Sequence, residues 1–108
     1  MKRYGTVVAA LASAAVLTAA QQTFAATGQV AVVNFAYSPA TLNISRGTTV
    51  TWTNGDTDPH TVTSSGSGPL DSPMLNKGDT FSFTFSSAGT FSYYCTVHPT
   101  MKGTVVVS

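Results

Sequence analysis

Apolar and polar side chains alternate over short stretches of this chain, and that period of two limits the folds it can adopt. The alternation is clearest at Val50 and Trp52, in Phe81–Phe85 and in Phe91–Cys95. Successive side chains of a β-strand point to opposite faces, so the pattern is typical of strands with one buried face. No part of residues 26–108 shows the period of an amphipathic helix. We therefore predict an all-β fold.

Turn-forming dipeptides separate the candidate strands. These are Ser38-Pro39, Arg46-Gly47, Asn54-Gly55, Lys77-Gly78 and Ala88-Gly89. Short strands at such spacing predict an antiparallel Greek-key β-sandwich or barrel of about seven strands. The expected strands are Gln29–Phe35, Thr41–Ser45, Thr48–Thr53, His60–Ser64, Thr80–Phe85, Thr90–Cys95 and Gly103–Val107.

The first 25 residues have the features of a secretory signal peptide. Lys2 and Arg3 precede an apolar stretch over residues 7–20, and small residues follow near Ala25. That stretch is short for a membrane span, so we expect no stable membrane insertion after cleavage. The chain then divides into a signal peptide, residues 1–25, and one domain, residues 26–108. The domain is expected to be exported to the periplasm or the extracellular space.

The charge of residues 26–108 argues against some partners. These residues include three basic side chains and four aspartates, which gives a net charge of −1. Without a basic patch, nucleic acid is not an expected partner. Low charge and small size favour a monomer. The charged residues are Arg46, Lys77 and Lys102 against Asp56, Asp58, Asp71 and Asp79.

Cys95 is the only cysteine of the chain, so no internal disulfide can form. Small exported domains bury little surface and usually rely on disulfides for stability. A bound metal ion is another way to stabilise such a domain.

Sulfur and nitrogen atoms that could bind a metal ion lie close together in sequence near the end of the chain. Cys95, His98 and Met101 follow at intervals of three between two expected strands, and His60 opens another. If the alternating faces are core faces, Cys95 and His60 both point inward at strand ends. Two histidines, one cysteine and a weak, distant methionine form the donor set of an electron-transfer copper site.

Each of these residues has a structural interpretation when it is considered alone. Cys95 could be a small buried hydrophobe, Met101 a core residue, and His60 or His98 a polar residue at a strand end or turn. The concentration of so many scarce donors in one arrangement favours the metal site. Met74 is a weaker candidate for the methionine ligand.

The chain resembles the cupredoxin family, in its amicyanin-like and plastocyanin-like branch, over essentially all of residues 26–108. The final segment, Cys95-x-x-His98-Pro99-x-Met101, has the short ligand loop of the amicyanin-like members. The other segments that carry the resemblance are Asn34-Phe35-x-Tyr37-x-Pro39, Gly47–Asn54, Pro59–Val62 and Gly89–Cys95.

The resemblance implies a type 1 (blue) copper protein that shuttles single electrons between exported redox partners and is not an enzyme. Its cofactor would be one copper ion, changing between Cu(I) and Cu(II). His60, Cys95, His98 and Met101 map onto the family's four ligands. The donor and acceptor proteins would dock transiently near His98.

Four further residues are expected to tune the site. In the family, the residue at Asn54 braces the cysteine-bearing loop. Thr61 stands where many relatives have Asn. The hydrogen bond that the Asn makes near the thiolate is therefore expected to be weaker here or to be replaced by a hydroxyl. Val97 stands where amicyanins have Pro, and we hypothesise that its N–H donates to the Cys95 sulfur. Pro99 is expected to stiffen the loop.

Two other functions use the same residues. A copper-handling protein would employ this ligand set for storage or delivery. A thiol enzyme would pair Cys95 with His98 or His60, but the sequence offers no evident carboxylate to orient the histidine beyond Asp56 and Asp58.

Overall fold

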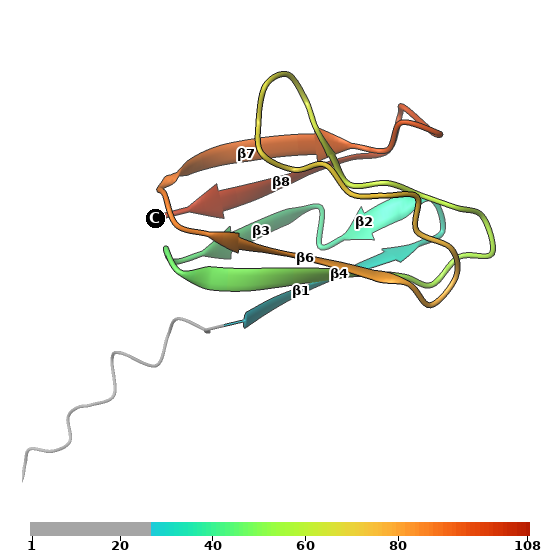
Figure 1. Ribbon diagram of the computed structural model, residues 1–108, viewed down its shortest axis with the longest axis horizontal. Coiled ribbons are helices and arrows are strands. Elements are labelled where there is room, and N and C mark those ends of the chain that lie inside the picture. The colour runs from blue at the N-terminus through green and yellow to red at the C-terminus, as the bar shows by residue number, and fades with distance from the viewer. Residues whose placement is uncertain (1–26) are drawn as a thin grey trace, which may run out of the picture.

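The computed structural model describes residues 27–108, and the predicted signal peptide lies outside these residues. Residues 27–108 form eight strands in two four-stranded sheets that face each other (Figure 1). This confirms the all-β sandwich. The strands are β1 (Thr27–Val33), β2 (Ala36–Ser38), β3 (Thr41–Ile44), β4 (Thr48–Asn54), β5 (Thr63–Ser64), β6 (Thr80–Phe85), β7 (Gly89–Tyr94) and β8 (Lys102–Val107).

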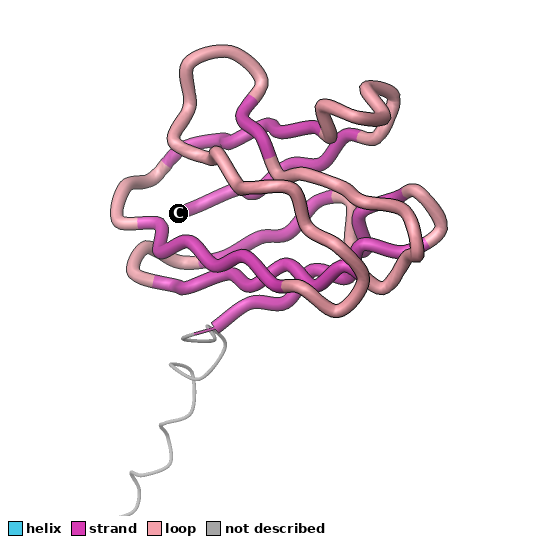
Figure 2. Tube along the Cα trace, turned by 45° about the vertical axis from the view of Figure 1, so that its right-hand side comes forward, coloured by secondary structure: helices cyan, strands magenta, loops and turns pink. Residues whose placement is uncertain are grey.

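The strand order is β2-β1-β4-β6 in one sheet and β3-β8-β7-β5 in the other. The β1–β4 and β3–β8 pairs are parallel, and the other pairs are antiparallel. Between β2 and β7 the chain passes repeatedly from one sheet to the other, so both layers are built from segments distant in sequence. Figure 2 shows only strands and loops in the coloured part of the chain. Over residues 27–108 there is accordingly no helix that could cross a membrane.

The first expected strand, Gln29–Phe35, is two residues too long. β1 ends at Val33, and the chain reverses through Asn34 and Phe35, whose φ angles are 54° and 57°. β2 then pairs antiparallel with β1, Val33 opposite Ala36. Two successive positive φ angles are typical of a type I′ hairpin turn, but neither residue is the glycine that usually marks one. For this reason the extra strand was not predicted.

The strand that we expected over His60–Ser64 is also shorter in the structure. Only Thr63–Ser64 forms β5, against β7. His60 lies in an isolated bridge with Leu75, in which each residue donates its N–H to the other's carbonyl. His60 is thus held by the long loop between β5 and β6, which passes beside it.

The core lies between the sheets and is rich in aromatic rings. Trp52, at the centre of β4, is fully buried, and its ring meets that of Tyr93 edge-on at 5.5 Å. Phe85 is buried, whereas Phe81 and Phe83 pack only partly against the core. Large apolar rings make the main contribution to burial in a domain of this size.

The inward faces of the strands match the sequence pattern near the metal donors. Tyr93 and Cys95 alternate with exposed or half-buried neighbours and are buried, as predicted. Gly103 pairs with Tyr93 across β7 and β8. A Cβ atom at residue 103 would lie 2.4 Å from the tyrosine ring, so only glycine leaves room for it.

Candidate metal centre

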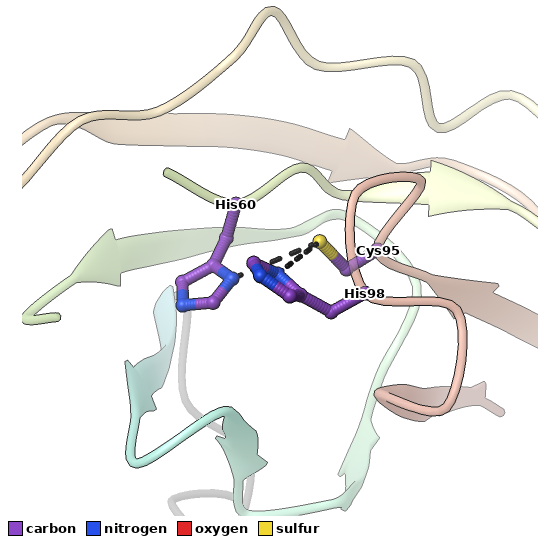
Figure 3. A group of neighbouring side chains, drawn as sticks. All are labelled: His60, Cys95 and His98. Atoms are coloured by element: carbon purple, nitrogen blue, oxygen red, sulfur yellow. Dashed lines mark hydrogen bonds between the residues drawn. The ribbon is translucent and has the colours of Figure 1, made fainter. Parts of the chain in front are cut away.

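Three ligand atoms converge at one end of the sandwich. The Nδ1 atoms of His60 and His98 each lie 3.7 Å from the Cys95 sulfur. The three atoms are all within 4.8 Å of one another. Figure 3 shows both imidazole rings directed toward the thiol, His60 from one loop and His98 from the loop that carries Cys95. The structure therefore brings together three of the four predicted ligands.

The loop between β7 and β8 is closed by its own backbone. The Cys95 N–H donates to the Met101 carbonyl at 3.2 Å, and the Met101 N–H donates to the His98 carbonyl at 2.9 Å. Met101 is 4% exposed, so it turns inward from the same short loop as the other donors. At the exposed side, the carbonyl of Pro99 accepts a hydrogen bond from the Lys102 ammonium.

Asn54 braces the segment before His60. The Nδ2 group of this buried residue donates to the carbonyls of Asp58 and Leu75, at 2.9 and 2.8 Å. Its Oδ1 accepts from the Asp56 N–H at 2.8 Å. We expected Asn54 to brace the Cys95 loop. Its side chain instead folds into the turn that follows it and fixes the histidine side of the site.

Thr61 joins the two ligand-bearing segments. Its backbone N–H donates to the Cys95 sulfur at 3.4 Å, and its hydroxyl accepts from the Thr96 N–H at 2.9 Å. Its carbonyl accepts from the buried Tyr37 hydroxyl at 2.5 Å. A hydroxyl therefore makes the cross-loop contact at this position.

The Cys95 side chain is prepared to act as a thiolate. Burial alone would raise its pKa, but the backbone N–H groups of Thr61 and His98, together with the contacts to the two imidazole rings, lower the pKa to about 6. Thiolate is the form that binds metal. The site thus favours metal binding at neutral pH.

Val97 lies at the outer side of the loop and is 41% exposed. Among the described residues, its N–H makes no hydrogen bond to the Cys95 sulfur; the backbone groups that lower the thiol pKa belong to Thr61 and His98. Groups three residues apart approach each other in a tight turn, which brings the amide of His98 rather than that of Val97 toward the sulfur.

Sequence reasoning missed two parts of the site. Asp56 contacts His60, with Oδ2 and Nε2 2.9 Å apart. The Phe35 ring meets the rings of His60 and His98 edge-on, at 5.4 and 5.0 Å. From the sequence, Asp56 is no more than one of two aspartates close to His60, and Phe35 is expected to end a strand. Only the three-dimensional contact of the β1–β2 turn with the loop after β4 reveals their places.

The donor set fits copper. Two imidazole nitrogens and one thiolate suit both oxidation states of copper, and a buried thioether nearby suits a weak additional ligand. A structural zinc site would ordinarily offer four strong ligands and no thioether. A two-layer sandwich with these donors at one end defines a mononuclear copper protein.

Comparisons with known proteins agree with this class. The family model described as a cupredoxin-like domain matches residues 6–107. Amicyanin-alpha of Methylorubrum extorquens is 40% identical over 104 residues, which cover 92% of this chain and 86% of that protein. A solved structure of a reduced amicyanin mutant superposes with a TM-score of 0.71, at 38% identity, over 76% of this chain and 82% of the other.

A second solved structure, a purple cupredoxin from Nitrosopumilus maritimus, has a TM-score of 0.67 at 39% identity. It covers 75% of this chain and 99% of its own. The chain therefore belongs to the cupredoxin family and is amicyanin-like.

Proposed function

We propose that this protein is a type 1 copper electron carrier that passes single electrons between exported redox proteins. The observation that carries the proposal is the convergence of the His60, Cys95 and His98 donor atoms within 4.8 Å. Copper bound there supplies a one-electron couple. The chain holds the donors in one arrangement through hydrogen bonds of both ligand-bearing loops, which limits rearrangement when the charge changes.

Met101 is our proposed fourth ligand. It is 4% exposed and its backbone is bonded to that of Cys95 and His98. Met74, in contrast, is 50% exposed, which does not favour it as a ligand. We expect Met101→Leu to keep copper but to change its visible spectrum and potential, because a thioether is lost without loss of volume.

His98 is the proposed point of electron entry and exit. Its side chain is 26% exposed, whereas that of His60 is 1% exposed. The apolar side chains of Phe35 and Val97 are exposed at 49% and 41%. We propose that donor and acceptor proteins dock over this surface. Val97→Glu should slow electron self-exchange by placing charge there, and Ser87→Glu, in the turn at the other end of β7, should not.

A thiol hydrolase offers a competing interpretation of the same geometry. Asp56, His60 and Cys95 form a row, because the carboxylate contacts Nε2 and the sulfur faces Nδ1 of the same ring. Cys95, however, is fully buried, which leaves a substrate no route to the sulfur. The row also leaves unexplained why His98 directs its own Nδ1 at that sulfur. We therefore propose that the protein has no catalytic reaction of its own.

The decisive experiment is copper loading of the purified domain, residues 26–108. We expect an intense visible absorption band, blue or purple, a type 1 electron spin resonance spectrum and a reversible one-electron couple, all absent from Cys95→Ser. A colourless copper adduct would refute the electron-carrier function. Rapid release of Cu(I) to a competing chelator, with no efficient self-exchange, would favour copper handling instead.

Export and oligomeric state complete the proposal. The features of residues 1–25 support export with removal of these residues. The low net charge and small size of residues 26–108 support a monomer. Terminal sequencing of the protein from the exported fraction, together with light scattering, tests both points.

A further inference from the structure

Asp56 receives hydrogen bonds from two different segments. Its Oδ1 accepts from the Asn34 N–H at 2.7 Å, and its Oδ2 accepts from the Phe35 N–H at 2.9 Å. Oδ2 also lies 2.9 Å from Nε2 of His60. The carboxylate is 15% exposed. One side chain thus connects the β1–β2 turn with a residue of the metal centre.

The geometry at His60 determines which ring nitrogen carries the proton. Nε2 faces a carboxylate, which can only accept a hydrogen bond when ionised, so the proton belongs on Nε2. Nδ1, which faces the Cys95 sulfur at 3.7 Å, is then left with a free lone pair. This is the tautomer that a metal ligand requires.

The same carboxylate holds an unfavourable turn in place. Asn34 and Phe35 both have positive φ angles, which asparagine adopts readily but which cost free energy in a bulky residue such as phenylalanine. Both of their N–H groups are bonded to Asp56, and this turn places the Phe35 ring edge-on against His60 and His98. Backbone strain maintained by a specific partner beside a functional site points to a functional reason for it.

We propose that Asp56 is a positioning residue of the copper site that lowers the reduction potential. It fixes the His60 ring with Nδ1 toward the metal and places a negative charge behind that ring. A carboxylate hydrogen-bonded to a ligating imidazole makes the imidazole a stronger donor. The stronger donor and the nearby charge both favour Cu(II), the more highly charged ion, over Cu(I). This inference rests on the proposed copper function.

Asp58 provides a matched control. Its carboxylate lies 3.8 Å from Nε2 of His98 and its side chain is 51% exposed. It carries the same charge at the other imidazole, but without a short hydrogen bond and with more solvent around it. Solvent screens such a charge strongly. Asp58→Asn therefore reports what the loss of a nearby charge does by itself.

The test compares Asp56→Asn, Asp56→Glu and Asp58→Asn in copper-loaded protein. Loss of an outer-sphere partner typically weakens metal binding about 10–100-fold. We expect Asp56→Asn to weaken Cu(II) binding at least tenfold more than Cu(I) binding, which raises the potential by about 59 mV. Asp56→Glu should recover at least half of the shift, and Asp58→Asn should produce less than a third of it.

A second readout uses the metal-free protein. Nitrogen-15 NMR of the imidazoles should show His60 as the single Nε2–H tautomer in the unsubstituted protein and as a mixture in Asp56→Asn. Equal potential shifts in Asp56→Asn and Asp58→Asn would overturn the proposal. A lower melting temperature with unchanged potential and tautomer would also overturn it, because Asp56 would then stabilise only the turn.

Asp56→Asn could fail to fold because the turn loses its partner. In that case Phe35→Gly serves as a new background, since glycine adopts a positive φ angle without strain. The reduction potential of Phe35→Gly/Asp56→Asn must then be higher than that of Phe35→Gly by about 59 mV, which again corresponds to a tenfold change in the preference for Cu(I). Equal potentials of these two variants would refute the role of Asp56. If both variants fold, as shown by circular dichroism, but neither binds copper while Asp58→Asn does so normally, the role of Asp56 in building the site is supported. If Phe35→Gly/Asp56→Asn also fails to fold, Asp56 stabilises the fold as a whole and its role as a positioning residue is refuted.

Discussion

The hydroxyl of Thr61 allows a sharp test of how the two ligand-bearing loops are joined. Thr61 is 5% exposed, and its Oγ1 accepts from the Thr96 N–H at 2.9 Å. Thr61→Val replaces this hydroxyl by a methyl group of similar size. The Thr96 N–H then loses its partner in a partly buried place, which costs about 1–2 kcal/mol. For a domain of this size each kcal/mol lowers the melting temperature by about 4–8 °C, so we expect a decrease of roughly 4–16 °C.

Thr61→Ser is the matched control, because it keeps the hydroxyl and removes one methyl group, worth about 0.8 kcal/mol when fully buried. Thr63→Val is the second control. The Thr63 hydroxyl contacts the Thr61 hydroxyl, and none of its described hydrogen bonds reaches a proposed copper ligand. Melting followed by circular dichroism, metal-free and copper-loaded, measures all three. The backbone N–H of Thr61 still reaches the sulfur in Thr61→Val, so the visible band should persist. A melting temperature of Thr61→Val at or above that of Thr61→Ser would show that the Thr61 hydroxyl does not stabilise the junction of the two loops.

Three other predictions follow from the site and the core. Once free copper exceeds the Kd of the site, each further tenfold rise in buffered free copper should add about 1.4 kcal/mol to the free energy of unfolding, roughly 6–11 °C in melting temperature. Cys95→Ser should show no such dependence. A copper-independent melting temperature in the unsubstituted protein would contradict the site. In the metal-free protein, thiolate absorbance at 240 nm should rise with a midpoint near pH 6. Because folding lowers this pKa below the ordinary value of about 8.5, the stabilisation relative to Cys95→Ser should be complete above that value and be lost as pH falls through about 6; a difference that is constant from pH 5 to 9 would refute it. Gly103→Ala should destabilise the domain by about 1–3 kcal/mol, since its Cβ would collide with Tyr93, and denaturant melts showing a cost no larger than that of Ser92→Ala would contradict the packing.

The sequence predicted the core side of the strands correctly where alternation was strong. Tyr93 and Cys95 are buried as the period of two required. The prediction was wrong where a turn used unusual residues. Asn34 and Phe35 have positive φ angles without glycine, so the sequence contained no signal for the end of β1.

The ligands were more predictable than their surroundings. His60, Cys95 and His98 are scarce donor types, and three such residues stand out in any chain of this length. Asp56 is an ordinary loop aspartate until the turn that precedes β2 lies against it. Its contacts with Asn34 and Phe35 span 22 and 21 residues of sequence.

The strand character, the direction of the inward faces and the donor types available for a metal follow directly from the amino-acid sequence, because they depend on residue identity and on the local geometry of an extended backbone. The tertiary structure alone decided which loops meet. It placed the Thr61 amide on the Cys95 sulfur, turned Asn54 toward the His60 segment, and set Asp56 behind the His60 ring. These contacts join segments that are distant or irregular, and their partners are chosen by the packing of two sheets rather than by any period along the chain.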